Sequence, residues 1–123
     1  MDLAMGHVYA DVSIADPRKT RIKNLKMLVD TGATHTLVNQ SLAKELGLQI
    51  LGESYVTLAD GTRKEAGVSL AFIEINGRSE IVRIRVFDVD EPVIGVSTLE
   101  DLGLCVDPVS GKLTPTRSFT ARA

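Results

Sequence analysis

The chain has almost none of the residues that disulfide-stabilised and zinc-binding proteins depend on. Cys105 is its one cysteine, and the two histidines, His7 and His35, have no cysteine or histidine at zinc-ligand spacing. No apolar run is long enough to span a membrane, and the N-terminus lacks a charged segment followed by an apolar export core. We therefore expect no metal, no cofactor, no membrane contact and a cytoplasmic location.

Aromatic residues and net charge are scarce as well. Tryptophan is absent and aromatics make up 4% of the chain, so the core has to come from Val, Ile and Leu, which favours β-structure. A net charge of −2 gives no reason to expect a nucleic-acid partner. The basic residues between Arg18 and Lys26 lack interleaved aromatics and are expected to be a solvated face. Cys105 lies in an apolar strand context and is expected to be a small core residue.

The first thirty residues predict two strands. Apolar residues alternate with more polar ones from Val8 to Ile14, which is the period of a strand with one buried face. The segment 16–19 contains proline between charged residues and predicts a turn. A second extended stretch begins near Ile22 and runs into the segment 30–33.

Two hairpins are predicted in the middle of the chain. Asp60-Gly61 and Asn76-Gly77 are both two-residue sequences of the strongest hairpin type, so each predicts a tight turn between antiparallel strands. The strand between them is predicted from alternating Val68, Leu70 and Phe72.

Two short helices are predicted from their capping residues. Asn39 is a suitable N-cap for a helix of about two turns that ends at Gly47. Ser97, with Glu100 three residues later, predicts a capping box that opens a second helix, and Gly103 predicts its end. A last turn is expected around 107–111.

The most informative motif is Asp30-Thr31-Gly32, which directly follows the apolar strand residues 27–29. Taken alone, this triplet indicates a turn in which the Asp side chain caps local backbone amides. Far downstream stands a hydrophobic-hydrophobic-Gly element, Val93-Ile94-Gly95. A strand, a tight turn and a helix ending in Leu-Gly-Leu also occur twice, at 28–48 and at 93–104. Together these features resemble the active-site loops and the internal repeat of aspartic proteases.

The chain has one such triplet where a two-lobed aspartic protease has two, and 123 residues are too few for two lobes. It therefore resembles the retropepsin-like, single-domain aspartic proteases, and among them the stand-alone prokaryotic members, since the domain begins almost at Met1. The resemblance implies one domain over 1–123, with its core at about 8–113. It also implies a mainly β, closed barrel-like fold with one or two short helices, in which a symmetric homodimer supplies the second carboxylate.

The resemblance also assigns roles to particular residues. Asp30 of each subunit would activate water, Thr31 would link the two loops across the dimer axis, and Gly32 would let backbone amides approach the carboxylate. The hairpin at Asp60-Gly61 would be the flap that closes over an extended peptide. The substrate-binding residues implied for the flap and the site wall are Ala33, Ala59, Asp60, Gly61, Thr62, Val93, Ile94 and Gly95.

Two departures from the family are visible. Retroviral members often carry an ion pair between an Arg after the Val93-Ile94-Gly95 position and an Asp after the triplet, whereas this chain has Val96 and Thr34 or His35 there. The flap tip also lacks the Tyr of pepsin-like enzymes. The leading hypothesis is an aspartic endopeptidase acting on peptides or proteins. The alternatives are a protease-fold module that binds extended peptides without cleaving them, and a small β-barrel interaction protein with an incidental triplet.

Overall fold

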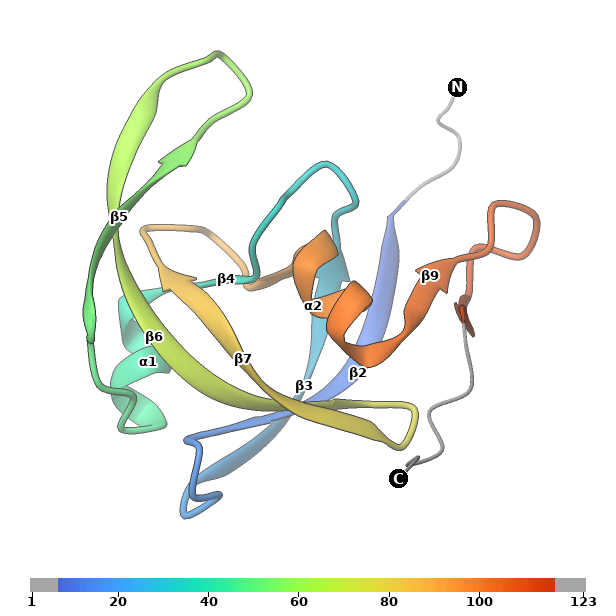
Figure 1. Cartoon of the computed structure of the whole chain (residues 1–123), viewed down its shortest axis with the longest axis horizontal. Helices are drawn as coiled ribbons and strands as arrows, with labels where there is room; N and C mark the ends of the chain where they lie inside the picture. The colour runs from blue at the N-terminus through green and yellow to red at the C-terminus, as the bar shows by residue number, and fades with distance from the viewer. Residues whose placement is uncertain (1–6, 117–123) are drawn as a thin grey trace, which may run out of the picture.

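A computed structural model describes residues 7–116 as a mainly β structure (Figure 1). The elements in chain order are β2 (Val8–Ala15), β3 (Ile22–Val29), β4 (Leu37–Val38), α1 (Gln40–Glu45), β5 (Gly52–Thr57), β6 (Arg63–Ile75), β7 (Arg78–Val86), β8 (Val93–Ile94), α2 (Val96–Leu102), β9 (Leu104–Val106) and β10 (Leu113–Pro115). The mainly β fold with two short helices that the sequence predicts is thus confirmed.

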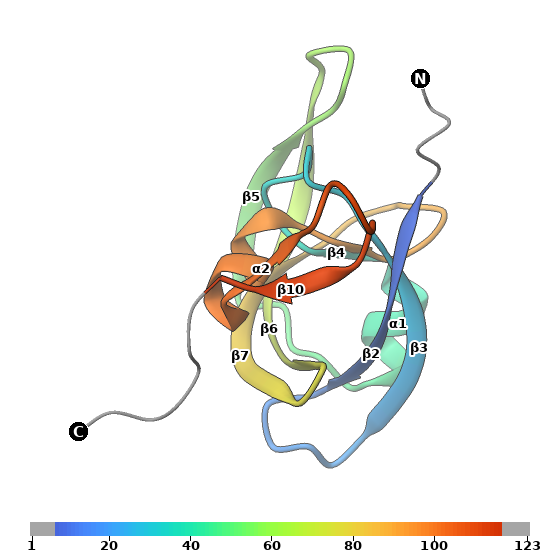
Figure 2. The same cartoon turned by 90° about the vertical axis from the view of Figure 1, so that its right-hand side faces the viewer.

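Within residues 7–116, seven strands form one sheet that closes on itself. Their order is β2-β3-β8-β4-β7-β6-β5, and an additional pairing joins β2 back to β6, for example Ile14 to Ile73. Six of the strands therefore form a ring, which leaves few free edges. Strands β9 and β10 form a separate two-stranded sheet beside α2 (Figure 2).

The core lies inside this ring and is almost entirely aliphatic. The alternation predicted for β2 is confirmed, because Val12 and Ile14 are buried there. In β6, however, the most deeply buried apolar residues are Ala71, Ile73 and Ile75, while Val68, Leu70 and Phe72, from which the strand is predicted, are only partly buried. Both sets are apolar, so sequence alone gives no reason to place one set inside.

Two strand-loop-strand-helix units cross each other at the centre of the sheet. The first unit runs from β3 through β4 to α1, and the second runs from β7 through β8 to α2. Strand β3 pairs in parallel with β8, β4 pairs in parallel with β7, and β4 and β8 pair antiparallel at Leu37 and Val93. Each unit thus contributes its short strand to the other unit, which holds the loops after β3 and β7 close together.

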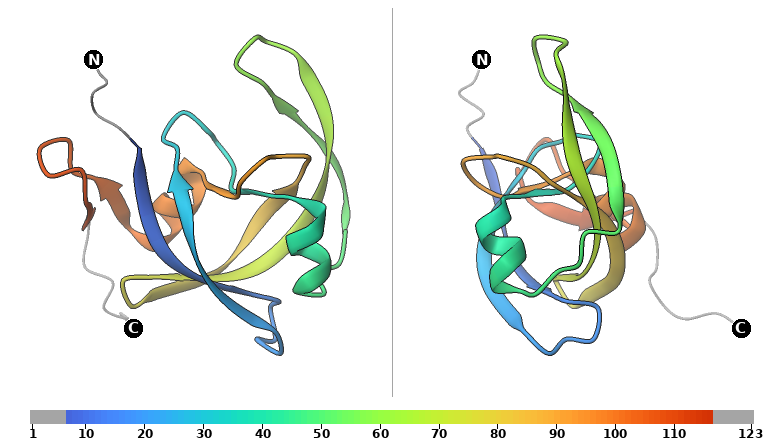
Figure 3. Two further views of the ribbon diagram at one scale, coloured as in Figure 1. Left: turned by 180° about the vertical axis from the view of Figure 1, so that it is seen from behind. Right: turned by 90° about the vertical axis from the view of Figure 1, so that its left-hand side faces the viewer.

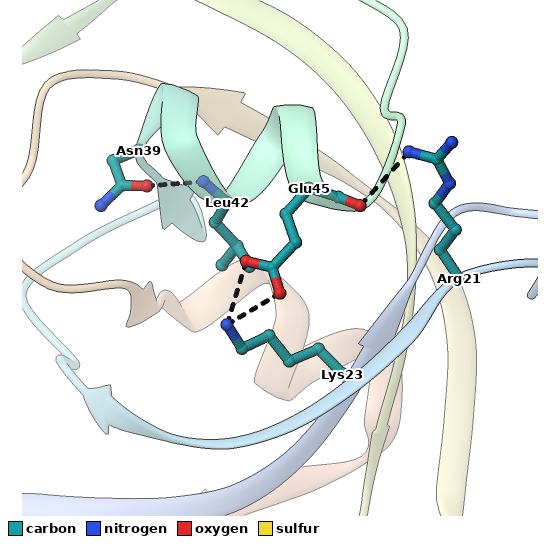
Figure 4. A network of polar contacts seen from close by, with 5 residues as sticks. All are labelled: Arg21, Lys23, Asn39, Leu42 and Glu45. Carbon is teal, nitrogen blue, oxygen red and sulfur yellow. Dashed lines mark hydrogen bonds and ion pairs between the residues drawn. The ribbon is translucent and has the colours of Figure 1, made fainter.

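Helix α1 begins and ends where the sequence predicts. The Asn39 side chain accepts a hydrogen bond from the Leu42 N–H at 2.8 Å, and Gly47 follows the helix with a φ of 67° (Figure 4). The helix is tied to β3 because Lys23 forms an ion pair with Glu45 at 3.0 Å, and Arg21, just before the strand, donates to the Glu45 carbonyl at 3.4 Å. Two residues of the basic segment therefore anchor the helix that follows the Asp30 loop.

One predicted helix start and one predicted turn differ in the structure, while a second turn is confirmed. Helix α2 has Gly95 as its N-cap, with no side-chain capping bond, so the capping box predicted from Ser97 and Glu100 is wrong. The hairpin at Asp60-Gly61 has a three-residue loop, because the Leu58 N–H donates to the Thr62 carbonyl at 2.7 Å, and not the two-residue turn predicted. The turn at Asn76-Gly77 does have two residues, since Ile75 pairs with Arg78.

The prediction that Cys105 is a small core residue is wrong, because the structure places it on β9 with its side chain exposed. Its strand is short and lies outside the closed sheet, and its neighbours Leu104 and Val106 are the ones that pack on the core.

Neither helix within residues 7–116 is long and apolar enough to cross a membrane. In the same part of the chain, no group of three or more His, Cys, Asp or Glu side chains is arranged to hold a metal ion.

Candidate active site

The Asp30 loop begins at the point where β3 leaves the sheet. The Asp30 N–H still donates to the Ile94 carbonyl at 3.0 Å, so the backbone of this residue is fixed by β8. Its side chain is held as well, because the Gly32 N–H donates to Asp30 Oδ1 at 2.9 Å. The Ala33 N–H closes the turn by donating to the Asp30 carbonyl at 3.0 Å. The loop therefore presents an oriented carboxylate on an exposed turn above a rigid strand.

The second half of the loop rests on the start of α2. The Val96 N–H donates to the Ala33 carbonyl at 2.8 Å, and the Ser97 N–H donates to the Thr34 carbonyl at 3.0 Å. The first amides of α2, which have no partner inside the helix, are thus used to bind the loop. Gly95 makes this approach possible, because a Cβ on Gly95 would lie 2.4 Å from the His35 carbonyl carbon and oxygen.

A buried pair of threonine hydroxyls joins the two units beneath the loop. Thr36 Oγ1 accepts a hydrogen bond from the Gly95 N–H at 3.0 Å and lies 2.6 Å from Thr98 Oγ1. Both side chains are fully buried, so the contact between the hydroxyls and the bond from the Gly95 N–H replace hydrogen bonds to water. Nothing in the sequence indicates this pair, since neither threonine belongs to a recognisable motif.

The predicted site residues fall into two environments. Asp30, Thr31 and Gly32 are exposed, and Ala33 is partly buried. Val93, Ile94 and Gly95 are buried beneath the loop, where the Ile94 carbonyl accepts from the Asp30 N–H and the Gly95 N–H donates to the Thr36 hydroxyl. The structure therefore brings the triplet and the downstream element together, as the sequence predicts.

The hairpin of β5 and β6 rises at the same end of the molecule as the Asp30 loop (Figures 1 and 3). Its tip carries the predicted flap residues Ala59, Asp60, Gly61 and Thr62, and all four are exposed. Gly61 has a φ of 87°, which a glycine adopts without strain. The Thr62 N–H donates to Asp60 Oδ1 at 2.8 Å, and hydrogen bonds from the Thr62 side chain and backbone lower the pKa of Asp60. The tip is therefore an ordered turn with an ionised carboxylate.

Beside the loop lies a basic pair that sequence reasoning missed. Arg85 Nη2 lies 3.4 Å from His35 Nε2, so the ring nitrogen accepts from the guanidinium. Burial, followed by the charges of Arg85 and Arg83, lowers the pKa of His35. Along β7, Arg83 and Arg85 alternate with Val82, Ile84 and Val86. This pattern predicts that both arginine side chains are exposed, but Arg85 is buried.

The closed sheet, the crossed units and the oriented aspartate define a retropepsin-like aspartic protease fold. Residues 20–101 match the family model described as "gag-polyprotein putative aspartyl protease". That match covers more than half of the chain, and the chain belongs to this family.

A solved structure gives the same result for the fold. The EIAV protease complexed with the inhibitor HBY-793 is similar to this chain with a TM-score of 0.66 and 23% sequence identity, and the match covers 84% of this chain and 93% of that chain. No curated protein matches the chain. The retropepsin-like fold expected from the sequence is therefore confirmed.

Proposed function

We propose that the chain is an aspartic endopeptidase whose active site forms in a homodimer. The observation that carries this proposal is the state of Asp30, which is exposed on a turn while its backbone and carboxylate are both held by hydrogen bonds. The turn residues Asp60 and Asp107 also accept a hydrogen bond from a backbone N–H two residues later, so the bond from the Asp30 N–H to the Ile94 carbonyl of β8 is what distinguishes Asp30. Membership of an aspartyl protease family supports the same interpretation of the loop.

The chemistry requires two carboxyl groups that share one proton. One carboxylate takes a proton from water while the other carboxylic acid protonates the oxygen of the scissile carbonyl. Two carboxyl groups held about 3 Å apart cannot both ionise, because their like charges would repel. The pair therefore keeps a single proton over a range of pH. The pKa values of such a site belong to the pair and not to either copy of Asp30.

A two-fold axis through the loops would supply the second carboxylate. An isologous interface presents the same residue twice, so one Asp30 per chain is enough. Thr31 is exposed next to Asp30 and is proposed to bind the partner's loop across the axis. The positions of the ion pair found in retroviral members hold Val96 and Thr34 or His35, so this dimer is proposed to depend on other contacts.

The hairpin tip is proposed to be the flap. Residues 59–62 would close over an extended peptide and hold it by main-chain hydrogen bonds, while Ala33 and the 93–95 segment would form the wall beneath. Closure excludes water other than the reacting molecule and strengthens the hydrogen bonds inside.

The proposal also treats the chain as one domain over 1–123, located in the cytoplasm, that acts on peptides or proteins. It needs no cofactor, because the dyad activates water by itself.

Peptide hydrolysis with inhibition by a transition-state mimic tests the proposed activity. The purified chain is incubated with a fluorogenic peptide library and with unfolded proteins at acidic and neutral pH, with and without a statine-type inhibitor. We expect cleavage that the inhibitor abolishes. Binding of peptides or inhibitor without any cleavage would contradict the enzyme and favour a peptide-binding module.

A further inference from the structure

Arg85 is a buried cation with unused hydrogen-bond donors. Its exposed fraction is 7%, and its Nε and Nη1 atoms are buried without a hydrogen-bond partner among the described residues. Within the same residues, its side chain bonds through Nη2 to His35 at 3.4 Å, which is long for a hydrogen bond. A guanidinium normally uses its donors fully when it is buried.

No acid compensates this charge within residues 7–116. Ion pairs in this part of the chain join Lys23 to Glu45 and Lys26 to Asp11, and neither includes Arg85. Burial and then the neighbouring charge of Arg83 lower the pKa of Arg85, and no carboxylate opposes them. A buried charge without a partner lowers the stability of the folded chain. Within the described residues, the chain without substrate carries such an unpaired charge at Arg85.

The place of Arg85 in the fold connects it to the proposed site. Its backbone N–H donates to the Thr36 carbonyl at 2.9 Å, at the end of the Asp30 loop, and its side chain reaches His35 within that loop. Its partner on the adjacent strand is Val68 of β6, the strand that continues into the proposed flap. Arg85 thus lies between the catalytic loop and the base of the flap hairpin.

We infer that Arg85 and His35 form an anion subsite beside the catalytic loop, and that it takes the carboxylate of a glutamate or aspartate side chain in the substrate. This inference rests on the proposed function, since it names the substrate class of that site. A guanidinium binds a carboxylate through hydrogen bonds that the charges strengthen. A peptide held as an added strand against the flap projects its side chains toward the walls of the cleft.

Paired peptides test the subsite. Peptides that differ only by Glu or Gln at one position are compared, position by position across the scissile bond, by kcat/KM with the wild-type chain. We expect Glu to be preferred about ten- to a hundredfold at one position, because a hydrogen bond to a charged group is worth that much. The preference should persist in about 1 M salt, since a buried pair is screened far less than a surface pair.

Arg85→Met removes the charge and keeps much of the volume, so it should bring the Glu to Gln ratio to about one. Arg83→Met is the matched control, because Arg83 lies on the same face of β7 but is exposed, and its ratio should equal that of the wild type. If Arg85→Met does not fold, Arg85→Lys replaces it and should lower the ratio in part. Equal ratios for Glu and Gln peptides in the wild type, or an equal loss in both methionine variants, would overturn the subsite.

Binding separates this inference from the proposed activity. The Asp30→Asn chain is titrated with the same peptide pairs by calorimetry, so the measurement needs no turnover. Tighter binding of the Glu peptide, lost in the Asp30→Asn, Arg85→Met double variant, supports the subsite even if no peptide is ever cleaved. Equal binding of both peptides contradicts the subsite even if cleavage is observed.

Discussion

Replacing Asp30 with Asn should lower kcat/KM for peptide hydrolysis by at least about a thousandfold. The amide has nearly the shape of the carboxylate but cannot take a proton from water. Its Oδ1 can still accept the bond from the Gly32 N–H, which measures 2.9 Å in the structure. We therefore expect the free energy of unfolding to change by no more than about 1 kcal/mol. Turnover of a fluorogenic peptide and urea unfolding measure the two effects.

Asp107→Asn is the matched control for this variant. Asp107 also accepts a backbone hydrogen bond, from the Val109 N–H at 2.9 Å, but it lies in the turn between β9 and β10. It should keep wild-type turnover with a similarly small effect on stability. Appreciable turnover by the pure Asp30→Asn protein would remove Asp30 from the mechanism.

The second large effect is on stability, and it arises at Gly95. An alanine Cβ at this position would lie 2.4 Å from the His35 carbonyl carbon and oxygen, which is far inside van der Waals contact. The clash is with backbone on both sides, so neither segment can move without breaking the bonds from Val96 to Ala33 and from Gly95 to Thr36. We expect Gly95→Ala to lower the free energy of unfolding by about 3 kcal/mol or more, as measured by urea unfolding.

Gly52→Ala is the control for any general effect of adding a methyl group. Gly52 lies in β5, and a Cβ added there would meet no atom within 4 Å, so its substitution should change stability by less than about 1 kcal/mol. Equal stability of the two alanine variants would show that the Asp30 loop does not pack on Gly95 as described.

Much of the fold follows from local sequence signals. Alternating residues predict β2, and Asn39, Gly47, Gly103 and Asn76-Gly77 set helix ends and a turn through backbone rules that act within a few residues. The resemblance to a known family, carried by motif spacing, predicts that Asp30 and Ile94 meet. These features depend either on interactions between residues close in sequence or on motifs that resemble a known family. A single sequence is therefore enough to predict them.

The parts that could not be predicted depend on tertiary contacts. Ser97 and Glu100 have a capping-box spacing, but the helix begins at Val96 with Gly95 as its N-cap, because the loop at Ala33 and Thr34 occupies the first amides of α2. Arg85 is buried although it alternates in position with the core residues Ile84 and Val86, and its side chain contacts His35, which is 50 residues away in the sequence. Strand periodicity says nothing about what covers the outer face of a closed sheet.

The most direct test of the shared site is to mix wild-type chains with Asp30→Asn chains under conditions in which subunits exchange. If each active site needs Asp30 from two chains, random pairing with a ninefold excess of the variant leaves about a tenth of the wild-type chains in fully active dimers. Activity per wild-type chain should then fall about tenfold, while a ninefold excess of Gly52→Ala chains should cause no such loss. Activity that stays proportional to the amount of wild-type chain, with a monomer mass in sedimentation at the assay concentration, would contradict the shared dyad.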